Sequence, residues 1–412
     1  MKKFILIALA ACAVAAQAVT VSDVSARQRW PWNNLVDVTF TVEGTAGTAY
    51  GVELNAVCAG GKRKLTCKTL LSEPIARVGA NRIVWDFGRD YPDFKADDMQ
   101  VSVLVTPFSD LTPVYLVIDV SGGASSASYP VRYTTQAPVH TLGSPDACKT
   151  TEIWLKRVKA GTGTFGGNRN YGYPTHTCTL TEDYYLGIFP VTQAQWEHVG
   201  SGKLTGSHSF FTNPAYAATR PVDNVGYEAV RDGSYGYPKT VAITQDTFIR
   251  RLRDRTGLSA IDLPTDWQWE YACRAGATTG GAYPDAYIRR AVNSLPEGKT
   301  AADKDASWSE DFGTCYVDRD TPNPWGFYSM LGNVHEWCAN CVAGVNEGDV
   351  LSDDYKGPEL TGTPSYKRSR RGGCWASESN YNCLYFSFYS DYGWTFDANT
   401  GFRIALTIPK AP

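Results

Sequence analysis

The chain has 412 residues, of which 43% are hydrophobic and 20% charged, and its formal net charge is −3. This charge excludes a broadly basic nucleic-acid-binding protein, and the 12 Trp, 24 Tyr and 16 Phe exclude a largely disordered chain. Because the length exceeds that of one ordinary domain, we expect two domains.

The first 18 residues have the features of a secretory signal peptide. Lys2 and Lys3 precede an apolar stretch over residues 4–16, and the Ala-Gln-Ala that follows matches the small-x-small pattern of a cleavage site. No later stretch approaches the roughly 18 uncharged apolar residues of a membrane helix, so no membrane span is predicted. We expect an exported, bacterial-type protein located in the periplasm, in the medium or at the cell surface.

Ten of the 11 cysteines follow the predicted signal peptide. In an exported chain such an even set predicts disulfides. Cys58 and Cys67 flank a Gly-Gly pair, which predicts a disulfide across a hairpin. Cys338 and Cys341 have the spacing of zinc ligands, but the sequence contains no second such pair and no His pair at finger spacing. Disulfides are therefore favoured over zinc.

Residues 19–120 predict a small antiparallel β-sandwich. Apolar and polar residues alternate with period two, as expected for strands that bury one face. The alternating apolar positions are Val36, Val38, Phe40 and Val42, then Val101, Val103 and Val105, then Val114, Leu116, Ile118 and Val120. No cluster of catalytic residue types accompanies them, so we expect a spacer or docking module.

Residues 121–147 predict a linker, because the small polar residues at its start indicate a flexible boundary. A second domain then covers residues 148–408. Its predicted helices lie at residues 192–198, 245–255 and 265–273, and a Thr N-cap opens the first and the third. Loops, short strands and aromatic residues make up the rest of this domain.

Six segments of the second domain occur in an order found in one protein family. They are GIFPVTQ at 187–193, RPVDNV at 220–225, LPTDWQWEYA at 263–272, NPWGFYSMLGNVHEW at 323–337, RGG at 371–373 and GFR at 401–403. The domain resembles the sulfatase-modifying-factor family, that is, formylglycine-generating-enzyme-like domains. The resemblance implies an α+β domain with a C-type-lectin-like core and little regular secondary structure.

The resemblance also implies a structural calcium site. Mapped onto this sequence, Gly332 and Val334 would offer backbone carbonyls and Glu336 a carboxylate, while Ser329 stands where the family usually has Asn or Asp. Hard oxygen ligands on a tight loop suit Ca²⁺. The alternative is that Glu336 only bridges groups inside the fold.

Members of this family that generate formylglycine oxidise a sulfatase cysteine, using copper, oxygen and a pair of active-site cysteines. Two thiolates suit Cu(I), which prefers soft sulfur ligands. Mapped here, the first catalytic position is Ser377, Cys374 replaces the family's Ser, and Cys383 is displaced by one residue from the second position. Cys374 and Cys383 are thus the candidate catalytic residues if the loop is rearranged, and copper is expected only in that case. The alternative is that both are structural disulfide partners.

Residues 377–400 are rich in aromatic, Ser, Asn and Asp residues and contain no Lys, Arg, Gln or Met. This composition is typical of recognition loops, whereas a core segment would contain more Leu, Ile and Val. We expect this surface to bind an extracellular protein or glycan. The predicted ligand-binding residues are Trp375, Tyr381, Tyr385, Phe388, Tyr389, Tyr392, Trp394 and Phe396.

The same segment resembles the variable regions that diversity-generating retroelements randomise at Asn codons. All residues of 377–400 except Glu378 and Trp394 are reachable from such codons. The sequence therefore supports two functions: an extracellular ligand-binding protein that has lost the catalytic cysteine pair, or a copper-dependent oxidase that acts on a sulfatase.

Overall fold

A computed structural model shows two compact units. They comprise Met1–Val117 with Val131–Ala137, and Ile118–Pro130 with Pro138–Pro412. The structure describes residues 19–29, 34–95, 98–108, 112–166, 175–200, 209–231, 243, 245–276, 288–306, 312–340, 349–354, 367–378, 391–392 and 397–408. The predicted signal peptide lies outside these residues.

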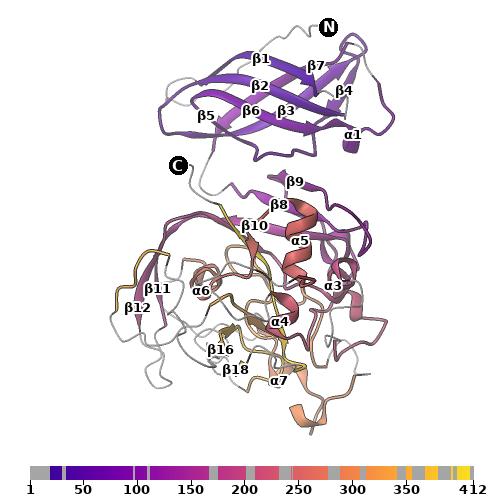
Figure 1. The fold of residues 1–412 in the computed structure, drawn as a ribbon, viewed down its shortest axis with the longest axis vertical. Helices are drawn as coiled ribbons and strands as arrows, with labels where there is room; N and C mark the ends of the chain where they lie inside the picture. Colours follow the sequence, from indigo (N-terminus) through magenta and orange to yellow (C-terminus); the bar gives the residue numbers. More distant parts are fainter. Residues whose placement is uncertain are drawn as a thin grey trace. The chain divides into compact units, whose positions relative to one another are not determined.

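The first unit contains two antiparallel sheets (Figure 1), with strand order β1-β2-β6 in one and β4-β3-β5 in the other, where β7 also pairs with β3. Its elements are β1 (Thr20–Gln28), β2 (Leu35–Glu43), β3 (Ala49–Cys58), β4 (Arg63–Thr66), β5 (Ile75–Arg77), β6 (Gly79–Asp86), α1 (Phe87–Asp90), β7 (Gln100–Pro107) and β9 (Val131–Thr134). The apolar positions of β2 alternate between buried and more exposed, as predicted. They share one hydrophobic core with the inward residues of β3, β6 and β7.

The hairpin predicted around the Gly-Gly pair is present, but the predicted disulfide across it is wrong. Cys58 lies opposite Arg63, whereas Thr66 lies opposite Asn55. Cys67 therefore lies about four residues from Cys58 along the ladder, roughly 13 Å, and a disulfide needs Cα atoms within about 7 Å. Both thiols are free, and no disulfide joins any two of the cysteines that the structure describes.

Strand β8 (Tyr115–Asp119) differs from the prediction for residues 114–120. It joins a six-stranded sheet, in the order β14-β20-β13-β10-β8-β9, and the division between the units crosses it. Leu116, Val117 and Ile118 are all fully buried. The alternation there was misleading, because a strand covered on both faces buries consecutive residues.

The first part of the segment predicted to be a linker, residues 121–130, belongs to the second unit and packs there. The Tyr129 hydroxyl donates hydrogen bonds to the carbonyl oxygens of Gly123 and His198, each at 3.1 Å. Arg255 donates to the carbonyl oxygen of Ala124 at 2.6 Å. These contacts fix the Gly- and Ser-rich turn.

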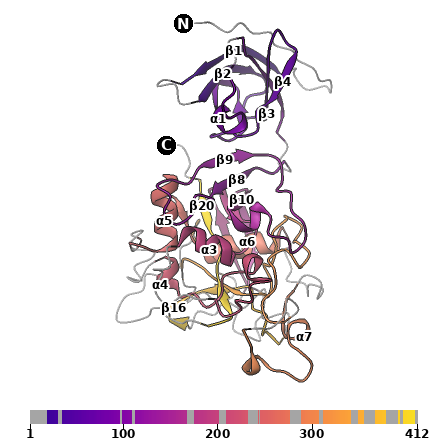
Figure 2. The same ribbon diagram turned by 90° about the vertical axis from the view of Figure 1, so that its right-hand side faces the viewer.

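The second unit consists of short elements joined by long loops (Figures 1 and 2). Its strands are β10 (Glu152–Val158), β11 (Gly161–Phe165), β12 (His176–Leu180), β13 (Tyr184–Gly187), β14 (Ile261–Asp262), β15 (His335–Trp337), β16 (Lys367–Arg368), β17 (Arg370–Arg371), β18 (Asp391–Tyr392), β19 (Thr400–Gly401) and β20 (Ala405–Thr407). Its helices are α2 (Ala147–Thr150), α3 (Gln193–Val199), α4 (Tyr227–Val230), α5 (Phe248–Thr256), α6 (Asp266–Arg274) and α7 (Ala291–Ser294), with 3₁₀ turns η2 (Ala217–Thr219) and η4 (Ala301–Asp303).

The three predicted helices are confirmed as α3, α5 and α6. Thr192 and Thr265 each form a capping box, with Gln195 and Gln268 respectively. Helices α3 and α5 pack against each other through stacked rings of Trp196 and Phe248, whose centroids lie 5.3 Å apart. Among the described helices, none has the length and apolar character needed to cross a membrane.

Candidate functional site

A three-stranded sheet, in the order β17-β15-β19, holds the two ends of the aromatic-rich segment. Arg371 of β17 lies opposite Glu336 in an antiparallel pair, and Thr400 of β19 lies beside His335 in a parallel pair. The chain therefore leaves β17 and enters β19 at the same end of β15. With one strand between them, the two stems are about 10 Å apart.

Trp375 lies in the core, so its prediction as a ligand-binding residue is wrong. Its side chain is 0% exposed, and its ring packs edge-on against Phe211 at 5.3 Å. The backbone N–H donates to the carbonyl oxygen of Asn333 and the indole N–H to that of Ala398, each at 2.9 Å. The Ser294 hydroxyl donates to the Trp375 carbonyl oxygen. Trp375, on the first stem, is thus linked to the second stem through Ala398, and its side chain lies in the core.

The other predicted ligand-binding residues fall almost entirely outside the described residues. These are Tyr381, Tyr385, Phe388, Tyr389, Trp394 and Phe396, together with the candidate catalytic Cys383. Only the backbone of Tyr392 is described, in strand β18, where it pairs with Lys367.

Cys374 is a buried thiol. Its sulfur accepts a hydrogen bond from the Ser377 hydroxyl at 3.7 Å, and its backbone N–H donates to the same hydroxyl oxygen at 2.9 Å. Burial raises the pKa of the Cys374 thiol to about 11, against the opposing effect of the Ser377 hydroxyl. At neutral pH only about one thiol in ten thousand would be ionised. A nucleophile needs the thiolate, so Cys374 is not an activated nucleophile in this arrangement.

Glu336 is engaged on both oxygens by side chains of the protein. Arg403 donates from Nε to Oε2 and from Nη2 to Oε1, both at 2.6 Å. The Trp269 indole N–H donates to Oε2 at 2.7 Å. Glu336 and Arg403 are fully buried. This geometry supports the interpretation in which Glu336 bridges groups inside the fold.

The other predicted calcium ligands are also buried in the same loop. The Ser329 hydroxyl donates to the carbonyl oxygen of Val317 at 3.0 Å, and Val334 is fully buried. Gly332 has φ +77°, and a Cβ atom there would lie 2.0 Å from the carbonyl oxygen of Arg289. Gly332 is thus required by close backbone approach. Glu336 and Ser329 are thus engaged by groups of the protein itself, and calcium at this loop stays a prediction.

Sequence reasoning missed a second buried charge cluster that fixes the Arg-Gly-Gly segment to α6. Arg371 Nε donates to Asp266 at 2.9 Å, and Arg371 Nη2 lies 2.9 Å from Glu270 Oε2. Glu270 also accepts from Arg274 at 2.7 Å and from the backbone N–H of Gly166 at 2.9 Å. Burial lowers the pKa of Arg371, but Asp266 and Glu270 outweigh this effect and hold it above its ordinary value. Arg371 is therefore charged.

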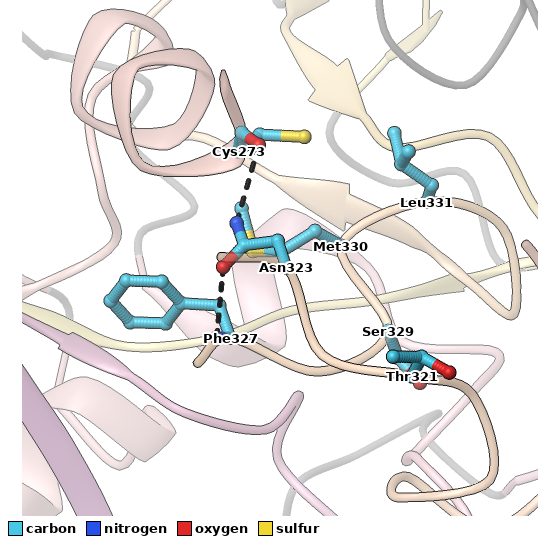
Figure 3. Close-up of a pocket in the computed structure, with 7 residues that line it drawn as sticks. All are labelled: Cys273, Thr321, Asn323, Phe327, Ser329, Met330 and Leu331. Atoms are coloured by element: carbon cyan, nitrogen blue, oxygen red, sulfur yellow. Dashed lines mark hydrogen bonds between the residues drawn. The ribbon is translucent and has the colours of Figure 1, made fainter. Parts of the chain in front are cut away.

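A small cavity lies beside helix α6 (Figure 3). Its lining residues are Cys273, Thr321, Asn323, Phe327, Ser329, Met330 and Leu331. The Asn323 amide donates to the carbonyl oxygen of Cys273 and accepts from the backbone N–H of Phe327 (Figure 3). It also donates to the carbonyl oxygen of Ala272. Burial raises the pKa of the Cys273 thiol. The polar groups of the cavity therefore stabilise the loop rather than face an open site.

These features define a loop-rich domain in which buried arginine–carboxylate pairs hold the stems of a long segment. The family model described as "Sulfatase-modifying factor enzyme 1-like domain" matches residues 144–408. The chain belongs to this family, as the motifs in its sequence predicted.

Three curated proteins are similar to parts of the chain. Serine/threonine-protein kinase pkn1 of Chlamydia pneumoniae is 30% identical over 115 residues, which are 28% of this chain and 16% of that protein. Chaperone protein LppX of Paenibacillus barcinonensis is 25% identical over 193 residues, 40% of this chain and 65% of that protein. Formylglycine-generating enzyme of Thermomonospora curvata is 32% identical over 161 residues, which are 35% of this chain and 48% of that protein. The chain thus spans less than two thirds of each.

Among solved structures, Treponema denticola variable protein 1 is similar to this chain, with 22% sequence identity and a TM-score of 0.46. The similarity covers 66% of this chain and 99% of that protein.

Proposed function

We propose that this is an exported ligand-binding protein of the family, in which the segment between β17 and β19 contacts an extracellular protein or glycan. In this proposal the first unit is a β-sandwich that serves as a spacer or docking module. The second unit has a C-type-lectin-like core that presents the segment.

The observation that carries the proposal is the anchoring of the two stems. They leave the same end of β15, and Trp375 and Ala398 are joined by a direct hydrogen bond. Arg370 holds the second stem through Asp397, with Nη1 2.8 Å from Oδ2. Binding residues are commonly found on loops that a rigid scaffold positions, and the amino acids between these stems are of the kinds that paratopes favour.

The state of Cys374 favours binding over oxidation. An oxidase of the parent family needs a pair of cysteines, whereas Ser377 stands at the first catalytic position and the nearby Cys374 thiol is buried. The alternative function, copper-dependent conversion of a sulfatase cysteine to formylglycine, would require a rearranged loop that brings Cys374 and Cys383 together as thiolates.

A conversion assay separates the two functions. The purified mature protein is incubated with and without copper, together with a sulfatase-type cysteine peptide, and the peptide mass is measured. We expect no conversion. Copper-dependent formylglycine that disappears in Cys383→Ser would establish the oxidase and contradict the binding proposal.

Binding is tested with an array of immobilised glycans and purified extracellular proteins. The triple variant Tyr385→Ala, Phe388→Ala, Tyr389→Ala should lose any signal given by the wild type. A control variant with Val139→Ala, Leu142→Ala and Val350→Ala removes apolar side chains that are 94%, 62% and 82% exposed elsewhere, and it should keep the signal. Equal loss in both variants would contradict a binding role for the segment.

The retroelement hypothesis is tested at the gene. We expect a nearby near-copy of the 377–400 coding region that is rich in Asn codons. A locus without such a template would contradict retroelement diversification and leave the binding proposal standing.

A further inference from the structure

Residues 115–143 precede the part of the chain that matches the family model, residues 144–408. They nevertheless contact the matched part, here called the family domain, at three separate places, and we name them the wrapping segment. Most of this segment, residues 118–130 and 138–143, belongs to the second compact unit, whereas residues 131–137 belong to the first.

The first contact is strand β8, which lies beside β10 in the six-stranded sheet (Figure 2). Just after β8, the backbone N–H of Val120 donates to the carbonyl oxygen of Thr151 at 2.8 Å. Leu116, Val117, Ile118 and Val120 are each 0% exposed. Burial of apolar side chains is the main stabilising term in folding, so these residues make β8 part of the core.

The second contact centres on Tyr129, which is 2% exposed. Its backbone N–H donates to the carbonyl oxygen of Arg255, in the last turn of helix α5, at 2.8 Å. The Arg255 guanidinium lies over the Tyr129 ring, 5.1 Å from its centroid, and donates to the Tyr129 hydroxyl. Because this hydroxyl also bonds to His198 near the end of α3, Tyr129 connects the segment to two helices of the family domain.

The third contact is a carboxylate of the family domain, Asp318, whose side chain is 0% exposed. His140 Nδ1 lies 2.9 Å from its Oδ2, and the backbone N–H of Gly143 donates to its Oδ1 at 3.2 Å. Lys149, equally buried, lies 2.7 Å from Oδ2. Buried polar groups need hydrogen-bond partners, and two of the partners of Asp318 come from the wrapping segment.

We infer that the wrapping segment is an integral part of the fold of the second unit, which therefore survives a cut in the chain between Thr134 and His140. Residues 135–137 are exposed, and Val139 is 94% exposed. On either side of this stretch, Tyr133 is held by a backbone hydrogen bond and His140 by the buried carboxylate. This holds whatever the segment between β17 and β19 binds.

The exposed stretch is also a site where an extracellular protease would cut first, because exposed loops with small and polar residues are preferred for nicking. Cleavage there gives a protein of two chains. The first chain supplies β8 and Tyr129 to the fold of the second, so the family domain is not released.

The experiment inserts the recognition site of a sequence-specific protease between Gln136 and Ala137 of the full chain. The protein is then cut and studied by size-exclusion chromatography and thermal unfolding. We expect the two fragments to elute together in native buffer and to separate in urea, with the Tm of the second unit less than about 5 °C below that of the uncut protein. Fragments that separate in native buffer would overturn the inference.

Variants show which contacts hold the fragments together. In the cut protein, Val117→Asp should release them, because it places a carboxylate at a buried position of β8. Fragments that stay together in this variant would show that contacts outside the wrapping segment hold them, and would contradict the inference.

A second variant serves in case Val117→Asp does not fold. Arg255→Met removes the guanidinium bonds to the wrapping segment and should lower the Tm of the uncut protein by about 4 °C or more. Arg250→Met is the matched control on the same helix, since Arg250 pairs with Asp254 on the surface and should change Tm little. Equal Tm values for the two variants would contradict the inference.

Discussion

The indole N–H of Trp375 donates a hydrogen bond to the carbonyl oxygen of Ala398 at 2.9 Å, across 23 residues of sequence. This bond closes the base of the segment that the sequence predicts to be a recognition surface. Its donor is a tryptophan that the aromatic composition alone would place on that surface.

Replacement of Trp375 should therefore destabilise the second unit rather than weaken a surface contact. Trp375→Phe should cost about 1–3 kcal/mol through loss of the indole hydrogen bond, and Trp375→Ala about 3–5 kcal/mol through the cavity it leaves. Urea unfolding measures both. The control is Trp154→Phe, whose indole N–H donates to the part-buried carboxylate of Glu152 at 2.8 Å. A Trp375→Ala variant of wild-type stability would contradict the assignment to the core.

The thiol of Cys374 should react slowly with alkylating agents in the folded protein. Its pKa of about 11 predicts labelling by iodoacetamide that rises about tenfold per pH unit between pH 7 and pH 10. Mass spectrometry of the peptide that contains Cys374 follows the rate, with urea-unfolded protein as the reference. Fast labelling at neutral pH would indicate a reactive thiolate and revive the oxidase.

Asp223 should make the protein more stable in mild acid than at alkaline pH. Burial raises its pKa to about 7, while the backbone N–H groups of Phe210 and Phe211 and the charge of Arg220 act in the opposite direction. A carboxyl whose pKa is higher in the folded than in the unfolded state binds protons more tightly when folded. Its stabilisation is complete below the unfolded pKa of about 3.9 and is lost as pH rises through 7, by at most about 1.4 kcal/mol per pH unit.

The measurement for Asp223 is urea unfolding at pH 5 and pH 8 for the wild type and for Asp223→Asn. The wild type should lose more stability between these two pH values than the variant. An identical loss in both proteins would show that Asp223 does not titrate in this range.

Loss of Arg371 should be strongly destabilising, because Asp266 and Glu270 would both be left without their cationic partner on β17. Removing one partner from a buried ion pair costs about 3–5 kcal/mol. We expect this cost for Arg371→Met in urea unfolding. The control is Arg29→Met, since Arg29 is 33% exposed and pairs with Asp37 on a sheet surface, where about 0–1 kcal/mol is expected. Equal effects of the two substitutions would contradict the role of Arg371.

Local features were predictable from the sequence, because they depend on neighbouring residues. The capped helices α3 and α6 follow from a Thr and a Gln three residues apart. The alternation of β2 follows from one buried and one more exposed face. Family membership was predictable as well, since six motifs in order are a strong signal.

Features that depend on distant partners were not predictable. Arg403 lies 67 residues from Glu336, and Arg371 lies 105 residues from Asp266, so no local pattern joins them. The failed disulfide depended on the register of the β3–β4 ladder, which the turn sets. The prediction for Trp375 was wrong because amino-acid composition does not distinguish a buried aromatic residue next to a recognition segment from an exposed one within it.

The pairing of β15 with β17 and β19 affects how long the segment between those two strands can be. Both neighbours of β15 meet the intervening segment at one end of the strand, so residues can be added to or removed from that segment without shifting the register of the sheet. Each doubling of such a loop costs only about 0.6 kcal/mol in closure entropy. The domain is therefore suited to accept inserted peptides of different lengths before or after β18, which lies within this segment and pairs with β16, as a carrier for grafted epitopes.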